Sequence, residues 1–386
     1  MPSEDLFAGA TPAMEGATDA TAWLVAMLEV EQALAAAVEG LGLLPDGAAD
    51  AVAAAAEVVA GGIDWRALRE EGAVAGTVVV PLVAAVRAAA GEGAAWVHVG
   101  ATSQDIIDSA MALVARRAAA VLAASLAAVT GSLAALADRH RHTVIAGRTL
   151  LQRGEPTTFG LKAAGWLSAV FDAGAGVTAA AAAIPAQLGG AVGTLSSFGE
   201  AGPQVVDRFA HRLDLPEPQV PWHTDRAPVV RLASALSLLA DAVGKVAGDI
   251  ILLAQTEVAE VAERADPGRG VSSAMPQKRN PVASVAAVAA VRRAGALGGA
   301  LAGPSQHQQE RAAGAWQAEA PMLSELFGHA AAAVAALADA LDGLVVDGGA
   351  MARNAGGECT AGPVGASDVL IDRVLARYAS SRREGG

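Results

Sequence analysis

The sequence predicts an all-α protein built around a bundle of long helices. Hydrophobic residues make up 53% of the 386 residues, but aromatic residues make up only 3%. This Ala/Leu/Val composition suits helices and could not fill the core of an all-β protein. No proline occurs between Pro81 and Pro156, which leaves room for one very long helix.

Residues 1–98 are expected to form a small N-terminal helical domain. Leu24, Met27, Leu28 and Leu34 recur at helical spacing. Breaks that contain glycine separate the helical pieces, at residues 40–45, 61–62 and 91–93.

Residues 99–342 are expected to form the central bundle of long helices. Periodic segments of such length without caps are typical of a bundle or a coiled coil. Several are apolar on more than one face, so other subunits are expected to cover them. The predicted helices run from Ser103 to Arg141, Thr158 to Ile184, Val229 to Arg264, Val282 to Leu301, and Gln306 to Leu341 with an interruption at Pro321.

Residues 343–386 are expected to form an abbreviated C-terminal helical segment. A glycine-rich stretch is followed by one amphipathic piece, Ala366 to Tyr378. The polar tail after it is expected to fray.

Charge and cysteine usage limit the partners and the location. The net charge is −13 with no long basic run, which argues against a nucleic-acid surface. The single cysteine, Cys359, excludes an internal disulfide and fits a reducing cytoplasm. The N-terminus has acidic residues where an export signal has basic ones.

One stretch, Ala118 to Ala137, has no charge over a length sufficient to span a membrane. It is mostly alanine with Ser, Thr and Gly, which gives little driving force for insertion. We therefore expect a buried helix in an oligomeric bundle and no membrane span.

Three polar segments interrupt the apolar background. In the first, residues 97–109, Thr102 is followed three residues later by Asp105, as in a capping box. This places Thr102 and Ser103 at the positive end of the longest predicted helix, where a carboxylate could bind. The alternative is a plain helix cap without a ligand.

The second polar segment, residues 147–160, is expected to end one helix and to start another through Pro156. Arg148, Thr149 and Gln152 supply hydrogen-bond donors there. A connector with capping threonines is the alternative interpretation.

The third polar segment, residues 266–282, is called the serine loop below. Its glycines indicate a mobile loop, and Asn280 with Pro281 is typical of a helix start. Ser272 lies six residues before Lys278. It could act as an alkoxide if cations and helix-start amides stabilise the charge. The alternative is a charged surface turn.

Other signatures of chemistry are weak or absent. His140 and His142 lie in a charged helix end, where solvation explains them better than metal binding. The sequence contains no G-x-G-x-x-G, no Walker lysine loop and no G-x-S-x-G elbow. Dinucleotide, nucleoside-triphosphate and hydrolase-triad chemistry therefore have no support.

Together the three polar segments resemble the signature regions of the fumarase/aspartase superfamily, and within it the branch of 3-carboxy-cis,cis-muconate cycloisomerases. The likeness runs from about residue 20 to residue 345. The most specific motif is SSAMPQKRNPVAS, and the others are HVGATSQDIIDSA, GRTLLQ, PTTFGLKAAGW, PWHTDR, LLAQTEVAEVAE and ERAAGAW.

The resemblance implies a fumarase/aspartase-like fold and a cofactor-free, metal-free lactonisation of 3-carboxy-cis,cis-muconate in protocatechuate breakdown. Ser272 would exchange the proton on the carbanion carbon, and Lys278 and Asn280 would hold the carboxylate that becomes enolate-like. The other acid groups of this small polycarboxylate would be bound by Thr102, Ser103, Thr149 and Gln152. The resemblance also implies a homotetramer whose sites each combine segments of three subunits.

Leu150 selects among the chemistries of the superfamily. Amine-releasing members carry a histidine directly after the Arg-Thr pair, where this chain has Leu150. A leaving amine needs a general acid, whereas a carboxylate leaving group does not. Elimination of another weakly basic group, such as nitrite from a substituted succinate, stays open. A non-catalytic helical scaffold is the alternative of a different class.

Overall fold

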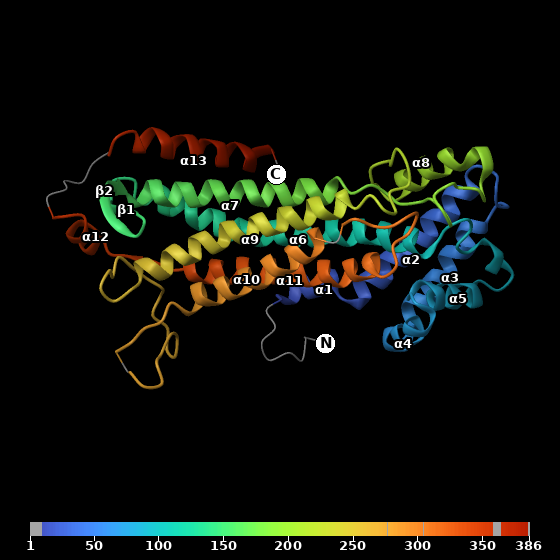
Figure 1. The fold of residues 1–386 in the computed structure, drawn as a ribbon, viewed down its shortest axis with the longest axis horizontal. Coiled ribbons are helices and arrows are strands. Elements are labelled where there is room, and N and C mark those ends of the chain that lie inside the picture. Colours follow the sequence, from blue (N-terminus) through green and yellow to red (C-terminus); the bar gives the residue numbers. More distant parts are fainter. Residues whose placement is uncertain (1–9, 276, 304, 358–363, 385–386) are drawn as a thin grey trace.

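The computed structural model describes residues 10–275, 277–303, 305–357 and 364–384, with side chains up to Ser381. They form an elongated bundle of long helices (Figure 1), which confirms the all-α prediction. In the bundle α6 packs on α7, and α10 packs on both α9 and α11. The long helices are α6 (Ser103–Arg139), α7 (Phe159–Ala182), α9 (Ala227–Leu253), α10 (Val282–Ala302) and α11 (Ala315–Leu341).

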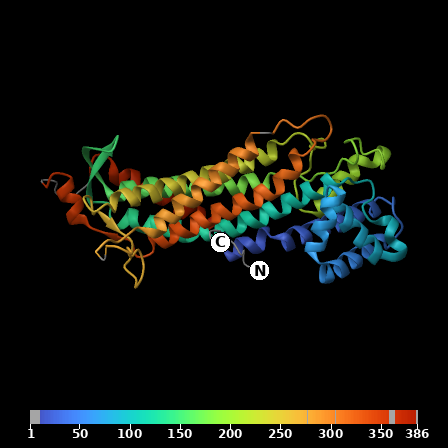
Figure 2. The ribbon, with the colours of Figure 1, turned by 60° about the horizontal axis from the view of Figure 1, so that its bottom comes forward.

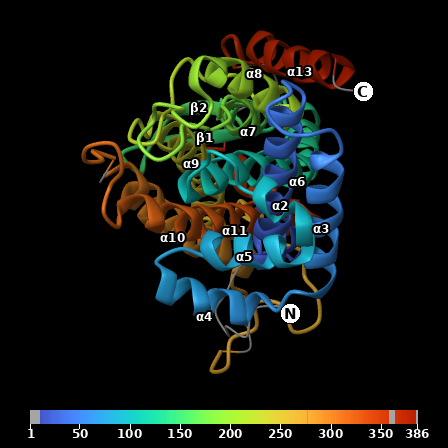
Figure 3. The same ribbon diagram turned by 90° about the vertical axis from the view of Figure 1, so that its right-hand side faces the viewer.

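Shorter helices gather at the end of the bundle where α6 begins (Figure 3). Most come from the first hundred residues, and α2 joins them to the bundle by packing against α6. They are α2 (Ala20–Glu39), α3 (Ala48–Gly62), α4 (Trp65–Ala75), α5 (Val79–Ala90) and η1 (Gly91–Trp96), with η2 (Gly199–Ala201) and α8 (Gly202–Arg212) from later in the chain. The first helix, α1 (Pro12–Thr18), lies farther along the bundle, against α6 and α11 (Figure 1).

Two small antiparallel sheets lie at the opposite end of the bundle (Figure 2). A hairpin pairs β1 (Val144–Thr149) with β2 (Gln152–Thr158), and β3 (Val261–Ala262) pairs with β4 (Val345–Val346). Two further helices follow β4, namely α12 (Gly348–Asn354) and α13 (Ser367–Glu384), and α13 lies along α7.

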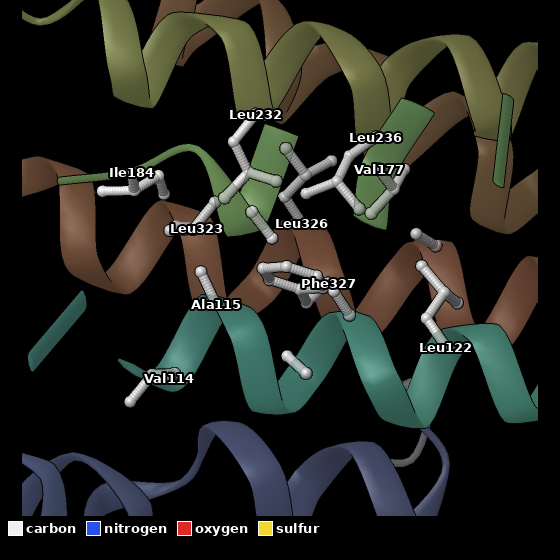
Figure 4. Close-up of a cluster of buried hydrophobic side chains, with 14 of the residues drawn as sticks. Val114, Ala115, Leu122, Val177, Ile184, Leu232, Leu236, Leu323, Leu326 and Phe327 are labelled. Carbon is white, nitrogen blue, oxygen red and sulfur yellow. The ribbon is translucent and has the colours of Figure 1, made fainter. Parts of the chain in front are cut away.

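The core of the bundle is made of apolar, mostly aliphatic side chains from four helices. Leu122 of α6, Val177 of α7, Leu236 of α9 and Phe327 of α11 belong to one buried cluster (Figure 4) and are at most 2% exposed. Burying a side chain of this size stabilises a fold by about 1.5–3 kcal/mol. The small residues bring helices close together: a Cβ atom at Gly174 would lie 2.7 Å from a methyl group of Leu126 on α6.

Three predicted helix boundaries are wrong. The helix expected to reach Arg264 ends at Leu253, because the chain turns back and Glu260 N donates to Leu253 O at 2.9 Å. The helix expected from Gln306 begins at Ala315 and runs through Pro321 without interruption. A proline in the second turn removes a single backbone hydrogen bond, and the helix tolerates that loss.

The third error concerns the C-terminal tail. The piece expected to end at Tyr378 continues as α13 to Glu384. Its side chains bind the bundle, because Arg377 pairs with Asp172 of α7 and Tyr378 packs edge-on against Phe171. These contacts hold α13 on the bundle up to Tyr378, and the polar tail continues the same helix to Glu384. Cys359, the single cysteine, lies outside the described residues.

The bundle exposes much apolar surface. Five stretches of the described chain are long and apolar enough to cross a membrane, judged by length and composition alone: Pro12–Glu39, Val79–Trp96, Ser103–Arg139, Val282–Ala302 and Ala315–Leu341. On α10 the exposed residues are mostly small and aliphatic, including Val282, Val285, Ala286, Ala289 and Ala296, with Arg292 and Arg293 between them.

Candidate active site

The serine loop leaves the fold through a narrow neck between β3 and α10. Gly270 O accepts hydrogen bonds from the backbone N of Asn280 at 2.9 Å and from its side-chain Nδ2 at 3.1 Å. Gly270 has a φ of 64°, and a Cβ atom there would lie 2.4 Å from Asn280 O. Only glycine fits this position, since a side chain would meet both backbone strain and a clash. The neck therefore fixes the two ends of the loop next to each other.

Ser272 lies just inside the neck, half-buried, with its hydroxyl oxygen turned toward backbone amides of the loop. Oγ accepts from Met275 N at 3.1 Å and from Ala274 N at 3.4 Å. Amide donors aimed at an oxygen favour its negatively charged form. The loop itself thus supplies part of the stabilisation that an alkoxide at Ser272 needs.

Lys278 is exposed on the far arm of the loop, and its backbone N donates to Met275 O at 3.0 Å. A cavity of about 900 Å³ lies beside the loop. Its lining includes Glu263, Arg269, Met275, Lys278 and Asn280. The loop therefore presents an ammonium group and a side-chain amide to a space large enough for a small polycarboxylate.

The helix begins at Val282, as predicted, but Asn280 is not its N-cap, and the first-turn amides are not available to a ligand. Pro281 is the N-cap of α10, and the side chain of Asn280 binds Gly270 instead. The Glu263 carboxylate accepts from Ala283 N at 3.2 Å and from Ser284 N at 2.8 Å. An acid of the chain itself thus occupies the positive end of α10.

The second polar segment connects α6 to α7 with Thr158 as the N-cap of α7, as predicted, but it does so as the hairpin β1–β2, which was not predicted. Thr149 and Gln152, both exposed, flank a two-residue turn made of Leu150 and Leu151. These leucines have φ values of 51° and 62° and are 95% and 70% exposed. Turns of this kind favour Asn and Gly, so two strained, exposed leucines point to a role outside the single chain.

Arg148 fixes the end of the hairpin next to the turn. Its guanidinium group makes a two-point ion pair with Glu260, at 2.7 and 2.8 Å, and the Glu260 side chain has no exposed surface. Asn354 of α12 donates to the same carboxylate at 2.9 Å. Paired hydrogen bonds of this type fix orientation as well as position, so the hairpin and β3 are held together.

Thr102 and Ser103 lie at the start of α6, as predicted. Thr102 N donates to Asp105 Oδ2 at 2.9 Å, in agreement with the predicted capping by Asp105. The buried Asp105 carboxylate also accepts from Gly190 N at 2.9 Å and from His223 Nε2 at 2.7 Å. The helix start that carries both hydroxyls is therefore rigidly held.

A buried ionic cluster behind this helix start was not predicted. Arg226 pairs with Asp108 of α6 at 2.8 Å and with Glu319 of α11 at 2.5 Å, and its side chain has no exposed surface. Burial works against the charge of Arg226, but Asp108 and Glu319 outweigh it and raise its pKa. Burial raises the pKa of Glu319 despite its hydrogen bonds from Arg226.

Arg311 is a further residue that the sequence reasoning missed. Its guanidinium group donates to Gln104 Oε1 at 3.2 Å and to Ala191 O at 3.1 Å, close to Ser103. The motifs PWHTDR and ERAAGAW contain Arg226 and Arg311. These two motifs could have drawn attention to both arginines. Neither motif, however, shows which of its charged residues faces a site.

One chain does not bring the three polar segments together. α6 contains 37 residues, and at a rise of 1.5 Å per residue it is about 55 Å long. Thr102 and Ser103 lie at one end of α6, whereas the hairpin and the serine loop project from different sides of the other end (Figures 1 and 2). A site that uses all three segments needs more than one copy of the chain.

The chain is similar to known lyases and cycloisomerases. The family described as Lyase matches residues 6–294. The chain is 40% identical over 347 residues to 3-carboxy-cis,cis-muconate cycloisomerase of Bradyrhizobium diazoefficiens, covering 89% of this chain and 76% of that protein. It is 41% identical over 354 residues to nitrosuccinate lyase of Streptomyces davaonensis, covering 88% of this chain and 74% of that protein.

The fold is also similar to solved structures. The 3-carboxy-cis,cis-muconate lactonizing enzyme from Pseudomonas putida matches with a TM-score of 0.85 and 32% identity, covering 98% of this chain and 88% of that one.

Proposed function

The chain belongs to the fumarase/aspartase superfamily of lyases, and on that premise we propose that it lactonises 3-carboxy-cis,cis-muconate to γ-carboxymuconolactone. One substrate carboxylate adds across a carbon–carbon double bond and forms the ring C–O bond. The displaced π electrons form a carbanion next to a second carboxylate, and a proton completes the isomerisation. No group leaves the substrate; the carboxylate becomes a neutral ester while the carbon takes up one proton from Ser272, and solvent returns a proton to Ser272.

The observation that carries the proposal is the environment of Ser272. The hydroxyl group donates its proton to the carbanion carbon, and the alkoxide left behind accepts hydrogen bonds from Met275 N and Ala274 N. In the direction of ring opening the same alkoxide removes the proton. Stabilisation by pre-placed amides lowers the cost of that charge without reorganisation.

Lys278 and Asn280 hold the carboxylate that gains enolate-like charge as the carbanion forms. Lys278 supplies the counter-charge, and Asn280 keeps one amide hydrogen for the substrate, because only one is used on Gly270 O. The remaining acid groups are bound by Thr102 and Ser103 of a second subunit and by Thr149 and Gln152 of a third.

This arrangement makes a homotetramer part of the proposal. Two features support it: the length of α6, which separates the segments, and the mostly apolar exposed residues of α10, which need an apolar cover. A cytoplasmic location is part of the same proposal, because assembly would cover the helix faces that could otherwise enter a membrane.

Elimination of nitrite from nitrosuccinate is the second candidate. It is favoured by the 41% identity to nitrosuccinate lyase, which is within one percentage point of the 40% identity to the Bradyrhizobium cycloisomerase. The same serine alkoxide would remove a proton next to a carboxylate, and the C–N bond would break with nitrite leaving. Like lactone opening, this step needs no general acid, in agreement with Leu150.

Two assays run side by side test the proposal. Loss of the diene absorbance after addition of 3-carboxy-cis,cis-muconate is the expected result. Release of nitrite from nitrosuccinate without loss of the diene would replace the first candidate by the second.

Ser272→Ala is expected to lower kcat on the active substrate by roughly 10³-fold or more while the helical circular dichroism is unchanged. Ser273→Ala is the matched control, because the neighbouring hydroxyl is given no proton-transfer role, and it should keep kcat within about tenfold. Equal losses in the two variants would contradict the role of Ser272.

A further inference from the structure

Glu263 contacts both ends of the serine loop. It follows β3 directly, and its side chain is 4% exposed. After the loop it accepts from Ala283 N at 3.2 Å, from Ser284 N at 2.8 Å and from Ser284 Oγ at 2.8 Å. Before the loop it pairs with Arg269 Nη2 at 3.0 Å. One buried carboxylate thus accepts four hydrogen bonds from the two arms that carry Ser272 and Lys278 between them.

Arg269 extends this contact to the bundle. Its Nη1 atom lies 2.8 Å from Asp339 Oδ2 on α11, and its side chain is 13% exposed. The neck between Gly270 and Asn280 follows directly along the chain. The loop is therefore anchored on α10 through Glu263 and on α11 through Arg269.

We propose that Glu263 is a positioning residue for the reaction. By joining Arg269 to the first turn of α10, it fixes the positions of Ser272 and Lys278 relative to each other. The catalytic part of this inference rests on the proposed function. Glu263 lines one wall of the cavity beside the loop, but its four hydrogen bonds go to Arg269, Ala283 and Ser284, so it acts through the loop. A carboxylate suits the position, because it neutralises the positive end of α10 and the guanidinium group together.

Removal of the carboxylate leaves a defined vacancy. In Glu263→Ala the amides of Ala283 and Ser284 and one face of Arg269 lose their acceptor, although the neck at Gly270 persists. The loop base then relaxes, and displacements of about 1 Å in a catalytic group can cost roughly 10²-fold in rate. Formate or acetate has the same charge and geometry as the lost group and can enter the vacancy.

The experiment compares Glu263→Ala with Asp266→Ala in the full-length protein. Asp266 is the matched control, since it also lies in the loop base but makes only an exposed pair with Arg264, and such pairs contribute little. The first readout is hydrogen exchange of the backbone amides of residues 270–284, which requires no activity. The second is kcat and KM on the substrate found active.

Glu263→Ala is expected to speed exchange in residues 270–284 by at least about tenfold and to lower kcat by roughly 10²-fold, with KM changed much less. Added formate should reverse part of both effects, and Asp266→Ala should show neither. Unchanged exchange in Glu263→Ala would overturn the inference whether or not either substrate is turned over.

If Glu263→Ala lost thermal stability but kept kcat per folded enzyme, the inference would also be overturned, because Glu263 would then stabilise the fold without positioning the loop for the reaction. If the wild-type protein turns over neither substrate, the proposed function fails, while the exchange experiment still decides whether Glu263 fixes the loop.

Discussion

His307 is a buried ionisable residue next to the ionic cluster at the start of α6. Its side chain is 1% exposed, and Nδ1 has no hydrogen-bond partner within the described residues. Burial lowers the pKa of His307, and the nearby Arg226 lowers it further. The residue is therefore neutral in the folded protein across a pH range in which it becomes charged in the unfolded chain.

The sign of the resulting pH dependence follows from this difference. Below the ordinary histidine pKa of about 6.5 the unfolded state binds a proton that the folded state does not. The contribution of His307 to stability is therefore present above that pH and is lost as the pH falls toward the lowered folded-state pKa. We expect His307→Asn to weaken the acid dependence of unfolding by up to about 1.4 kcal/mol per pH unit.

Urea unfolding at about pH 7.5 and about pH 5.5 measures the effect. His211→Asn is the matched control, because His211 is exposed on α8 and should leave the pH dependence of the wild-type protein unchanged. The prediction fails if His307→Asn and the wild-type protein lose the same stability between the two conditions.

At the residue scale, the sequence predicted site residues best where they lie close together along the chain. Ser272, Lys278 and Asn280 share one loop because they are neighbours along the chain. The role of Glu263 could not be predicted, since its contact with Ser284 joins residues that the serine loop separates. The ion pairs of Arg226 depend on the packing of three helices, which no local pattern specifies.

At the scale of the element, the hairpin tip is another feature that the sequence did not predict. Long uninterrupted helices such as α6 and α7 follow from apolar periodicity and from the absence of proline. The hairpin could not be predicted in this way. Arg148 and Glu155 interrupt the alternation of apolar and polar residues that is typical of a strand, and the turn, Leu150–Leu151, lacks the usual Asn-Gly signal. The sheet forms because the ends of α6 and α7 place its strands side by side.

Replacement of the turn by its preferred residues tests why the leucines are there. Leu150→Asn with Leu151→Gly removes two strained left-handed positions, each of which costs about 1–3 kcal/mol. We expect the double variant to resist urea at least as well as the wild-type protein. It should nevertheless lose more than about tenfold in kcat, because the exposed apolar tip no longer packs against a neighbouring subunit.

Leu43→Asn is a suitable control for this experiment. Leu43 is also exposed, at 46%, but it lies in a turn among the N-terminal helices and has an ordinary φ. Leu43→Asn should change neither the resistance to urea nor kcat by much. Full activity in the hairpin double variant would show that the leucines have no part in the site.

At the scale of the whole molecule, the length of α6 determines which polar segments one chain can bring together. The hydroxyls of Thr102 and Ser103 and the serine loop are separated by the length of the bundle, about 55 Å by helix geometry. No bending of a single chain brings them together without breaking α6. If the start of α6 and the serine loop act on one substrate, they belong to different subunits. A mixture of two inactive variants, each altered in one of these segments, should then regain activity.

Ser272→Ala and Ser103→Glu provide such a pair, because one removes the proton donor and the other places a repelling carboxylate where an acid group of the substrate would bind. After joint refolding of equal amounts, a site is intact when its serine loop comes from one variant and its α6 start from the other. Random assembly makes this true for about a quarter of the sites, so about a quarter of wild-type activity should return.

The control for this mixture uses Ser272→Ala with Lys278→Ala. Both substitutions lie in the serine loop, so every loop in the mixture carries one defect and no site is complete. Recovery in the first mixture but not in the second requires sites that combine segments of different copies. Equal failure of both mixtures would mean that the start of α6 and the serine loop never share a substrate, and the elongated chain would then have to build its site at one end alone.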